Sequence, residues 1–267
     1  MSGVSLKPRA PFEARVDMAG ITPAVTCSLT LRELEPLAVP YGARSVPLAE
    51  LFFIESAPEG VLLIEIGDAR LDGVGAGMTQ GELIVDGTVG AWAGRGMTGG
   101  MLRIGGDAGD FLGAELSGGR IELGGSAGAW VGTASSGSRR GMSGGTIVIA
   151  GSAGAQAAAR QRGGLIVIAG DAGERLATDM IAGTVSVGGA IGPLMGRGMR
   201  RGTIFASAVP DALPAGFIDT GAHELVAVSL MARRVPELSA MLKGWTLTRR
   251  IVGDTLMGGQ GEVLVSA

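Results

Sequence analysis

Glycines that recur at a fixed interval constrain the fold of this chain more than any other feature. Each of these anchor glycines opens a short apolar segment, and they lie at Gly81, Gly100, Gly119, Gly145, Gly164, Gly183 and Gly202. Five of the six intervals between them are equal, and only the step from Gly119 to Gly145 is longer. A constant interval indicates units that stack on one another, because a single unit of this size cannot bury its own apolar residues.

The segment after each anchor alternates between inward and outward positions. After Gly164 the second and fourth residues are Ile166 and Ile168, and every other repeat is also apolar at these two positions. A period of two is typical of β-strands, and the constant return stacks them in parallel about 4.8 Å apart. We therefore predict an all-β fold, a parallel β-helix of about seven coils of 19 residues, with glycine at the corners.

The pattern divides the chain into three parts. The parallel β-helix is predicted over residues 61–207, between an N-terminal capping segment, 1–60, and a C-terminal capping segment, 208–267. Both caps show mixed helix and strand patterns, and an amphipathic helix is expected over residues 229–243. Caps are needed because an open parallel edge invites aggregation.

Two features of the repeats have alternative interpretations. The longer interval places an insertion at residues 133–140, which is either a binding loop or a passive one. The outward positions of the later repeats are apolar at Val148, Leu165, Val167 and Phe205. Such a strip requires cover, which either the C-terminal helix or a partner protein would supply.

Composition excludes several functions. The net charge is −3 and the 22 basic residues are scattered, so we expect no nucleic-acid partner. The single cysteine, Cys27, forbids an intrachain disulfide or a cysteine-based metal site, and is expected to be a small buried residue. No stretch reaches about 18 apolar residues and no signal peptide opens the chain, so we expect a cytoplasmic protein without a membrane segment.

The side chains required for catalysis are also scarce. The one histidine, His223, follows the repeats and is expected to be a surface or capping residue. Histidines, cysteines and carboxylates nowhere cluster at metal-ligand spacing. We therefore expect no active site, metal or cofactor held by this chain alone. An independent acyltransferase, the enzymatic alternative for such a repeat, would need a histidine on the coils.

The triplet Arg-Gly-Met precedes three anchors at the same distance. It places Arg95, Arg140 and Arg197 at equal offsets, and Arg139 lies beside the second of them. If equal offsets share one edge, these four arginines are candidates for binding an extended anionic ligand by charge-assisted hydrogen bonds. The alternative is that they are solvated or form salt bridges with partner proteins.

Three segments give a resemblance to a known family: residues 39–48 (VPYGARSVPL), residues 75–87 (GAGMTQGELIVDG) and residues 140–145 (RGMSGG). Over residues 25–205 the chain resembles the C subunits of formylmethanofuran dehydrogenase and of formyltransferase/hydrolase complexes. The C-terminal domain of the glutamate synthase large subunit shares the repeat but lacks the first of these segments.

The resemblance implies a right-handed β-helix that acts as a non-catalytic scaffold. Its partners would be a zinc amidohydrolase-like subunit, a formyltransferase subunit and a dehydrogenase-B-like subunit. Such a complex converts the formyl group of a formyl-tetrahydromethanopterin-type carrier, through formylmethanofuran or an analogue, to formate in formaldehyde oxidation. The methanofuran-type carrier has a glutamyl tail, which the arginines would contact.

Two further possibilities remain open: the C subunit of a molybdenum or tungsten formylmethanofuran dehydrogenase, and a spacer module like that of glutamate synthase. Arginine makes up 20 of the 22 basic residues, which suggests a GC-rich bacterial genome and favours the hydrolytic complex.

Overall fold

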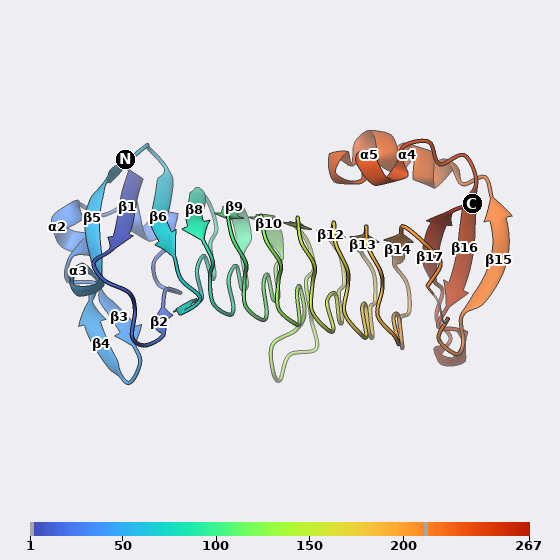
Figure 1. Ribbon diagram of the computed structural model, residues 1–267, viewed down its shortest axis with the longest axis horizontal. Helices are drawn as coiled ribbons and strands as arrows, with labels where there is room; N and C mark the ends of the chain where they lie inside the picture. The colour runs from blue at the N-terminus through green and yellow to red at the C-terminus, as the bar shows by residue number, and fades with distance from the viewer. Residues whose placement is uncertain (1–2, 211–212) are drawn as a thin grey trace.

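The repeats form a long row of parallel strands in the computed structural model, which describes residues 3–210 and 213–267 (Figure 1). Seven strands follow or include the anchor glycines: β8 (Glu82–Gly87), β9 (Thr98–Ile104), β10 (Gly118–Leu123), β11 (Thr146–Ile149), β12 (Leu165–Ile168), β13 (Thr184–Val187) and β14 (Thr203–Ala206). Each pairs in parallel with the next, one repeat further along the chain, so that Ile147 lies opposite Ile166 and Ile166 opposite Val185.

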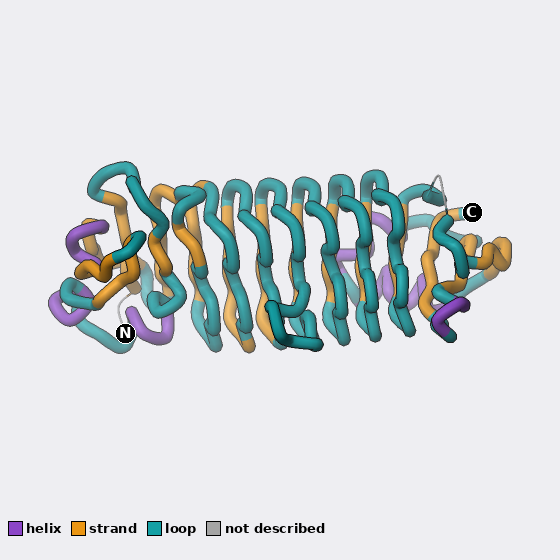
Figure 2. Tube along the Cα trace, turned by 90° about the horizontal axis from the view of Figure 1, so that it is seen from below, coloured by secondary structure: helices purple, strands orange, loops and turns teal. Residues whose placement is uncertain are grey.

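The prediction of an all-β, right-handed parallel β-helix is wrong. The strands belong to one mixed sheet of 13 strands, in the order β15-β16-β17-β14-β13-β12-β11-β10-β9-β8-β6-β1-β5, and short helices accompany it. Each repeat gives only one strand to this sheet, and most of its other residues lie in turns and loops (Figure 2). Single parallel bridges link these other parts of successive repeats, as between Ala108 and Ala127. The sheet is mixed because antiparallel strands extend it at both ends.

The N-terminal end of the row combines strands and short helices. Strand β6 (Val61–Gly67) pairs in parallel with β1 (Gly3–Pro8), which pairs antiparallel with β5 (Phe52–Ala57). A second sheet contains β4 (Arg44–Pro47), β3 (Ala38–Tyr41), β2 (Val16–Asp17) and β7 (Leu71–Asp72). The helices here are α1 (Pro23–Thr26), α2 (Leu31–Leu34) and α3 (Leu48–Leu51).

The C-terminal end continues the same sheet. Strand β17 (Gly261–Ser266) pairs in parallel with β14, and β16 (Thr248–Gly253) and β15 (Ile218–His223) follow antiparallel. The short 3-10 helix η1 (Thr255–Met257) joins β16 to β17. Residues 1–2 and 211–212, which belong to the predicted capping segments, lie outside the described residues.

One apolar core runs along the repeats. The alternating positions identified in the sequence supply it, and Leu83, Ile121, Ile166 and Val185 are fully buried. Each such side chain contributes about 1.5–3 kcal/mol of burial. The backbones of successive repeats approach closely at the anchors: a Cβ atom on Gly119 would lie 2.7 Å from the carbonyl oxygen of Gly100.

This close approach can be tested with two glycines that differ in their surroundings. Gly119 and Gly77 both have positive φ, +82° and +68°, but a Cβ atom on Gly77 would meet nothing within 4 Å. Gly77→Ala should therefore cost about 1 kcal/mol of backbone strain. Gly119→Ala should cost clearly more, because the repeats must also move apart. Equal losses of stability in chemical denaturation would show that the contact is unimportant.

Two C-terminal helices cover the outer face of the later strands. They are α4 (Val226–Arg234) and α5 (Pro236–Leu242), which replace the single predicted helix because the residue before Pro236 disfavours helical backbone. Phe205, Val228, Leu238, Leu242 and Leu264 form a second apolar cluster, and Leu165 and Val167 pack against it. Helices α4 and α5 of the chain itself therefore cover much of the apolar strip that the sequence predicts on the outer face of the strands.

An ion pair fixes α5 to the sheet. Arg120 of β10 pairs with Glu237 in the first turn of α5 and also with Glu122, which in turn accepts a hydrogen bond from Arg103. The pKa of Glu237 lies below its ordinary value, because its carboxylate accepts a hydrogen bond from its own backbone N–H and another from Arg120.

A carboxyl group with a lowered pKa stabilises the fold above its ordinary pKa, and this contribution is lost as the pH falls through the lowered value. Glu237→Gln should therefore reduce the free energy of unfolding at pH 7 by about 0.5–1 kcal/mol. The difference from the wild type should vanish as the pH falls well below 4.5, the ordinary value for glutamate. Thermal unfolding between pH 3 and pH 7 measures this, and a difference independent of pH would contradict it.

Candidate functional site

The turns that follow each strand place equivalent side chains in rows along one edge of the repeats. One row occupies the same position in six successive repeats and comprises Trp92, Phe111, Trp130, Gln156, Arg175 and Leu194, all with φ between 59° and 65°. Its first three rings stack, with centroids 3.9 Å apart for the first pair and 4.9 Å for the second. Repetition of one backbone conformation thus brings residues one repeat apart into contact.

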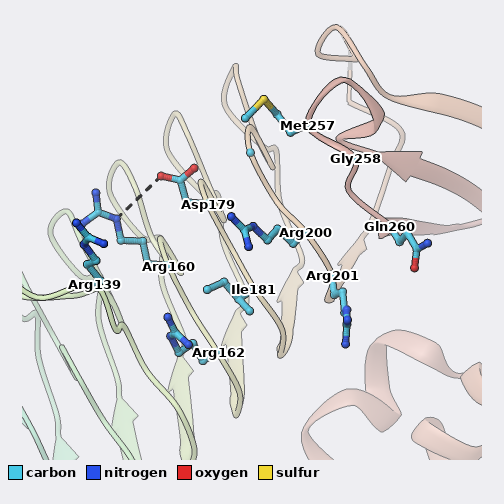
Figure 3. Close-up of a pocket in the computed structure, with 11 residues that line it drawn as sticks. Arg139, Arg160, Arg162, Asp179, Ile181, Arg200, Arg201, Met257, Gly258 and Gln260 are labelled. Atoms are coloured by element: carbon cyan, nitrogen blue, oxygen red, sulfur yellow. Dashed lines mark ion pairs between the residues drawn. The ribbon is translucent and has the colours of Figure 1, made fainter.

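A second set of rows forms a groove with a volume of 920 Å³ in the later repeats (Figure 3). Arg162 and Arg200 occupy the same position two repeats apart, with Ile181 at that position between them. The other lining residues are Arg139, Arg160, Asp179, Gly198, Arg201, Met257, Gly258 and Gln260. The groove begins at the inserted loop, which carries Arg139, and ends at the segment after η1.

The groove is strongly cationic although the whole chain is slightly acidic. Five arginines face one carboxylate, Asp179, which lies 4.0 Å from Arg160, whose guanidinium also donates to the backbone oxygen of Ser138. The other four guanidiniums have no hydrogen-bond or ion-pair partner within residues 3–210 and 213–267. Unpaired guanidiniums gathered in a hollow favour an anionic ligand, because each offers several charge-assisted hydrogen bonds.

The four arginines singled out in the sequence do not share one site. Arg139 lines the groove, and Arg197 lines a neighbouring hollow of 720 Å³ that shares Asp179, Gly198 and Met257 with it. Arg95 lies far from both along the repeats, with its guanidinium 5.4 Å from the centre of the Trp92 ring. Arg140 is exposed at the end of the inserted loop and lines neither cavity.

The three triplet arginines lie at the same distance before the next anchor glycine but not at the same place on the repeat, because the insertion precedes Arg140. Arg95 and Arg197 follow their preceding anchors at the same distance, but the insertion separates Arg140 further from its own preceding anchor, Gly119. In that repeat Thr133 takes the position of Arg95 instead: its backbone oxygen accepts a hydrogen bond from Glu115, as the oxygen of Ala114 does from Gly96 one repeat earlier.

The triplet pattern also missed four of the groove arginines, which are Arg160, Arg162, Arg200 and Arg201. Aligning the repeats on the preceding anchor would have found Arg162 and Arg200, since two full repeats separate them.

The other residues considered in the sequence show no arrangement typical of catalysis. His223 is exposed in β15, and its ring contacts Thr220 through Nε2. Cys27 is a free thiol at the C-terminal end of α1 and is half-buried rather than buried. No group of three histidine, cysteine or carboxylate residues that would hold a metal ion occurs in the described part of the chain. None of the described helices is long and apolar enough to cross a membrane.

Comparison with known proteins gives full-length and partial matches. No family model matches the chain. The C subunit of the formyltransferase/hydrolase complex (Fhc) of Methylorubrum extorquens is 41% identical over 86 residues, 32% of each chain. The C subunit of the molybdenum-containing formylmethanofuran dehydrogenase 1 of Methanothermobacter thermautotrophicus is 36% identical over 94 residues, 34% of this chain and 24% of the relative. These alignments thus span a third or less of each relative.

The structural comparison extends over the whole chain. One chain in the crystal structure of the formyltransferase/hydrolase complex (FhcABCD) from Methylorubrum extorquens, in complex with methylofuran, superposes with a TM-score of 0.92 and 40% identity. The match covers 98% of this chain and 99% of that one. A likeness of this extent defines the class: a repeat subunit homologous to those of multi-subunit formyl-transferring enzymes. The chain belongs to the C-subunit family shared by Fhc complexes and formylmethanofuran dehydrogenases.

Proposed function

We propose that the chain is the scaffold subunit of a cytoplasmic formyltransferase/hydrolase complex and carries no active site of its own. The complex would convert the formyl group of a formyl-tetrahydromethanopterin-type carrier, through formylmethanofuran or an analogue, to formate during formaldehyde oxidation. The observation that carries the proposal is the likeness over almost the full chain to a component of FhcABCD. Residues 61–207 would align the partners, and segments 1–60 and 208–267 would close the two ends.

The proposed partners are a zinc amidohydrolase-like subunit, a formyltransferase subunit and a dehydrogenase-B-like subunit. Affinity purification of the tagged chain from its native host, with mass spectrometry and metal analysis, tests this directly. We expect these three partners with zinc and without molybdenum or tungsten. Recovery of the chain as a monomer or homo-oligomer would refute the scaffold role.

A second candidate is the C subunit of a molybdenum or tungsten formylmethanofuran dehydrogenase. The 36% identity to such a protein supports it. The same purification distinguishes the two, since molybdenum or tungsten in the assembly would favour the dehydrogenase.

Within the complex, the arginine groove would bind the anionic part of the furan-type carrier. Methylofuran is present in the related structure, and the groove gathers five arginines, including the predicted Arg139. Arg197, in the adjoining hollow, would extend this cationic surface. Arg95 and Arg140 lie outside both cavities, so we assign them the other predicted role, ion pairs with partner subunits.

Removing two groove arginines should weaken carrier binding. We expect Arg162→Ser/Arg200→Ser to raise the Kd of the assembled complex for methylofuran by about tenfold or more, because the loss of even one charge-assisted hydrogen bond costs about 1.5–3 kcal/mol net of water. The affinity of the variant should also depend less on salt. Arg233→Ser/Arg234→Ser, at exposed arginines of α4, is the matched control. If calorimetry shows that both double variants bind methylofuran equally well, the groove is not the binding site of the carrier.

A further inference from the structure

The hollow beside the groove gathers exposed apolar side chains. Leu256 and Met257 of η1 are 72% and 68% exposed, and Leu194 is 41% exposed, yet all three line the same 720 Å³ cavity. Isolated exposed apolar residues are ordinary on protein surfaces. Several that converge on one hollow are typical of a surface that binds another molecule.

The turn that presents these residues is held in place by side-chain hydrogen bonds to the backbone. Asp254 is only 5% exposed, and its carboxylate accepts hydrogen bonds from the backbone N–H groups of Leu256 and Gly198 at 3.0 and 3.2 Å. The hydroxyl of Thr255 donates to the backbone oxygen of Gly216 at 2.7 Å. Because the turn is fixed before any partner arrives, little conformational entropy is lost on binding.

The charges around the hollow indicate what would bind there. Arg175 and Arg197 line it, are exposed, and have no ion-pair or hydrogen-bond partner for their guanidiniums in the described part of the chain. The exposed carboxylate in the lining, Asp179, pairs with Arg160 of the groove at 4.0 Å. Val226 of α4, which is also strongly exposed, has different surroundings: the cavity that it lines contains Arg250 and Glu262, which already pair with each other at 2.9 Å. An apolar centre with unpaired arginines at its rim is complementary to an apolar protrusion flanked by carboxylates.

A second copy of the chain fits this surface poorly. A symmetric contact places the same patch on both sides, so that each copy would bring its own arginines close to those of the other. Like charges juxtaposed in an interface are costly. The charge distribution therefore favours a different protein as the occupant.

We infer that the hollow is the docking site for another subunit of the complex, which presents an apolar side chain flanked by aspartate or glutamate. This inference rests on the proposed function. Because the hollow and the groove share Asp179, Gly198 and Met257, the docked subunit stands at the end of the arginine groove. A carrier held in the groove would thus lie beside a subunit boundary.

The test compares two matched double variants in the co-expressed complex. Leu256→Ser/Met257→Ser removes the apolar centre of the hollow, and Val226→Ser/Leu230→Ser removes residues of α4 that are 73% and 52% exposed. We expect the first to lower the affinity for one identified partner subunit about tenfold or more, and the second to leave it unchanged. Unaltered thermal unfolding of each isolated variant shows that both fold.

A charge reversal gives an independent readout. Arg175→Glu/Arg197→Glu should slow association with the same partner and remove its acceleration at low salt. If Leu256→Ser/Met257→Ser binds the partner as tightly as the wild type does, the inference about the hollow is overturned. The complex still forms in that case, so the proposed function is unaffected. A wild-type chain that recruits no partner would overturn both. Self-association of the wild type that the hollow variant abolishes would instead identify a second copy as the occupant.

Discussion

The close backbone contact between successive repeats is the constraint on which this structure depends. A Cβ atom at Gly119 would lie 2.7 Å from the backbone of the preceding repeat, so glycine is required there for the strands to pair. Pairing at this distance fixes the register, which places Ile147, Ile166 and Val185 in one buried column. The backbone contact and the apolar core are therefore two consequences of the same stacking.

Stacking also explains why the surface is organised in rows. Any side chain that recurs at the repeat interval lies next to its equivalent, which produces both the stacked rings of Trp92, Phe111 and Trp130 and the shared groove position of Arg162 and Arg200. The inserted loop and η1 interrupt this regularity at two places, and the groove lies between them. The groove is thus bounded by two segments that depart from the repeat, and part of its positive charge comes from arginines that recur at the repeat interval.

The arginines of the protein divide into two groups according to their partners. Arg103 and Arg120 on the outer face of the sheet pair with carboxylates, and Arg120 connects α5 to β10. Arg162 and Arg200 of the groove face no carboxylate close enough to form an ion pair among the described residues. The first group stabilises the fold, whereas the second leaves positive charge available to a ligand or partner.

The sequence by itself determined the repeat, the strand positions, the inward residues and the family, because these depend on local alternation and on a constant interval. It could not determine the sheet, since the antiparallel strands at both ends come from segments without a period, and their pairing depends on which edge they reach. It also could not assemble the site: Arg139 and Arg197 line neighbouring cavities, and the insertion removes Arg140 from the row position that Arg95 and Arg197 share. Only the tertiary structure brings Met257 and Arg162 to one groove, because no interval in the chain relates them.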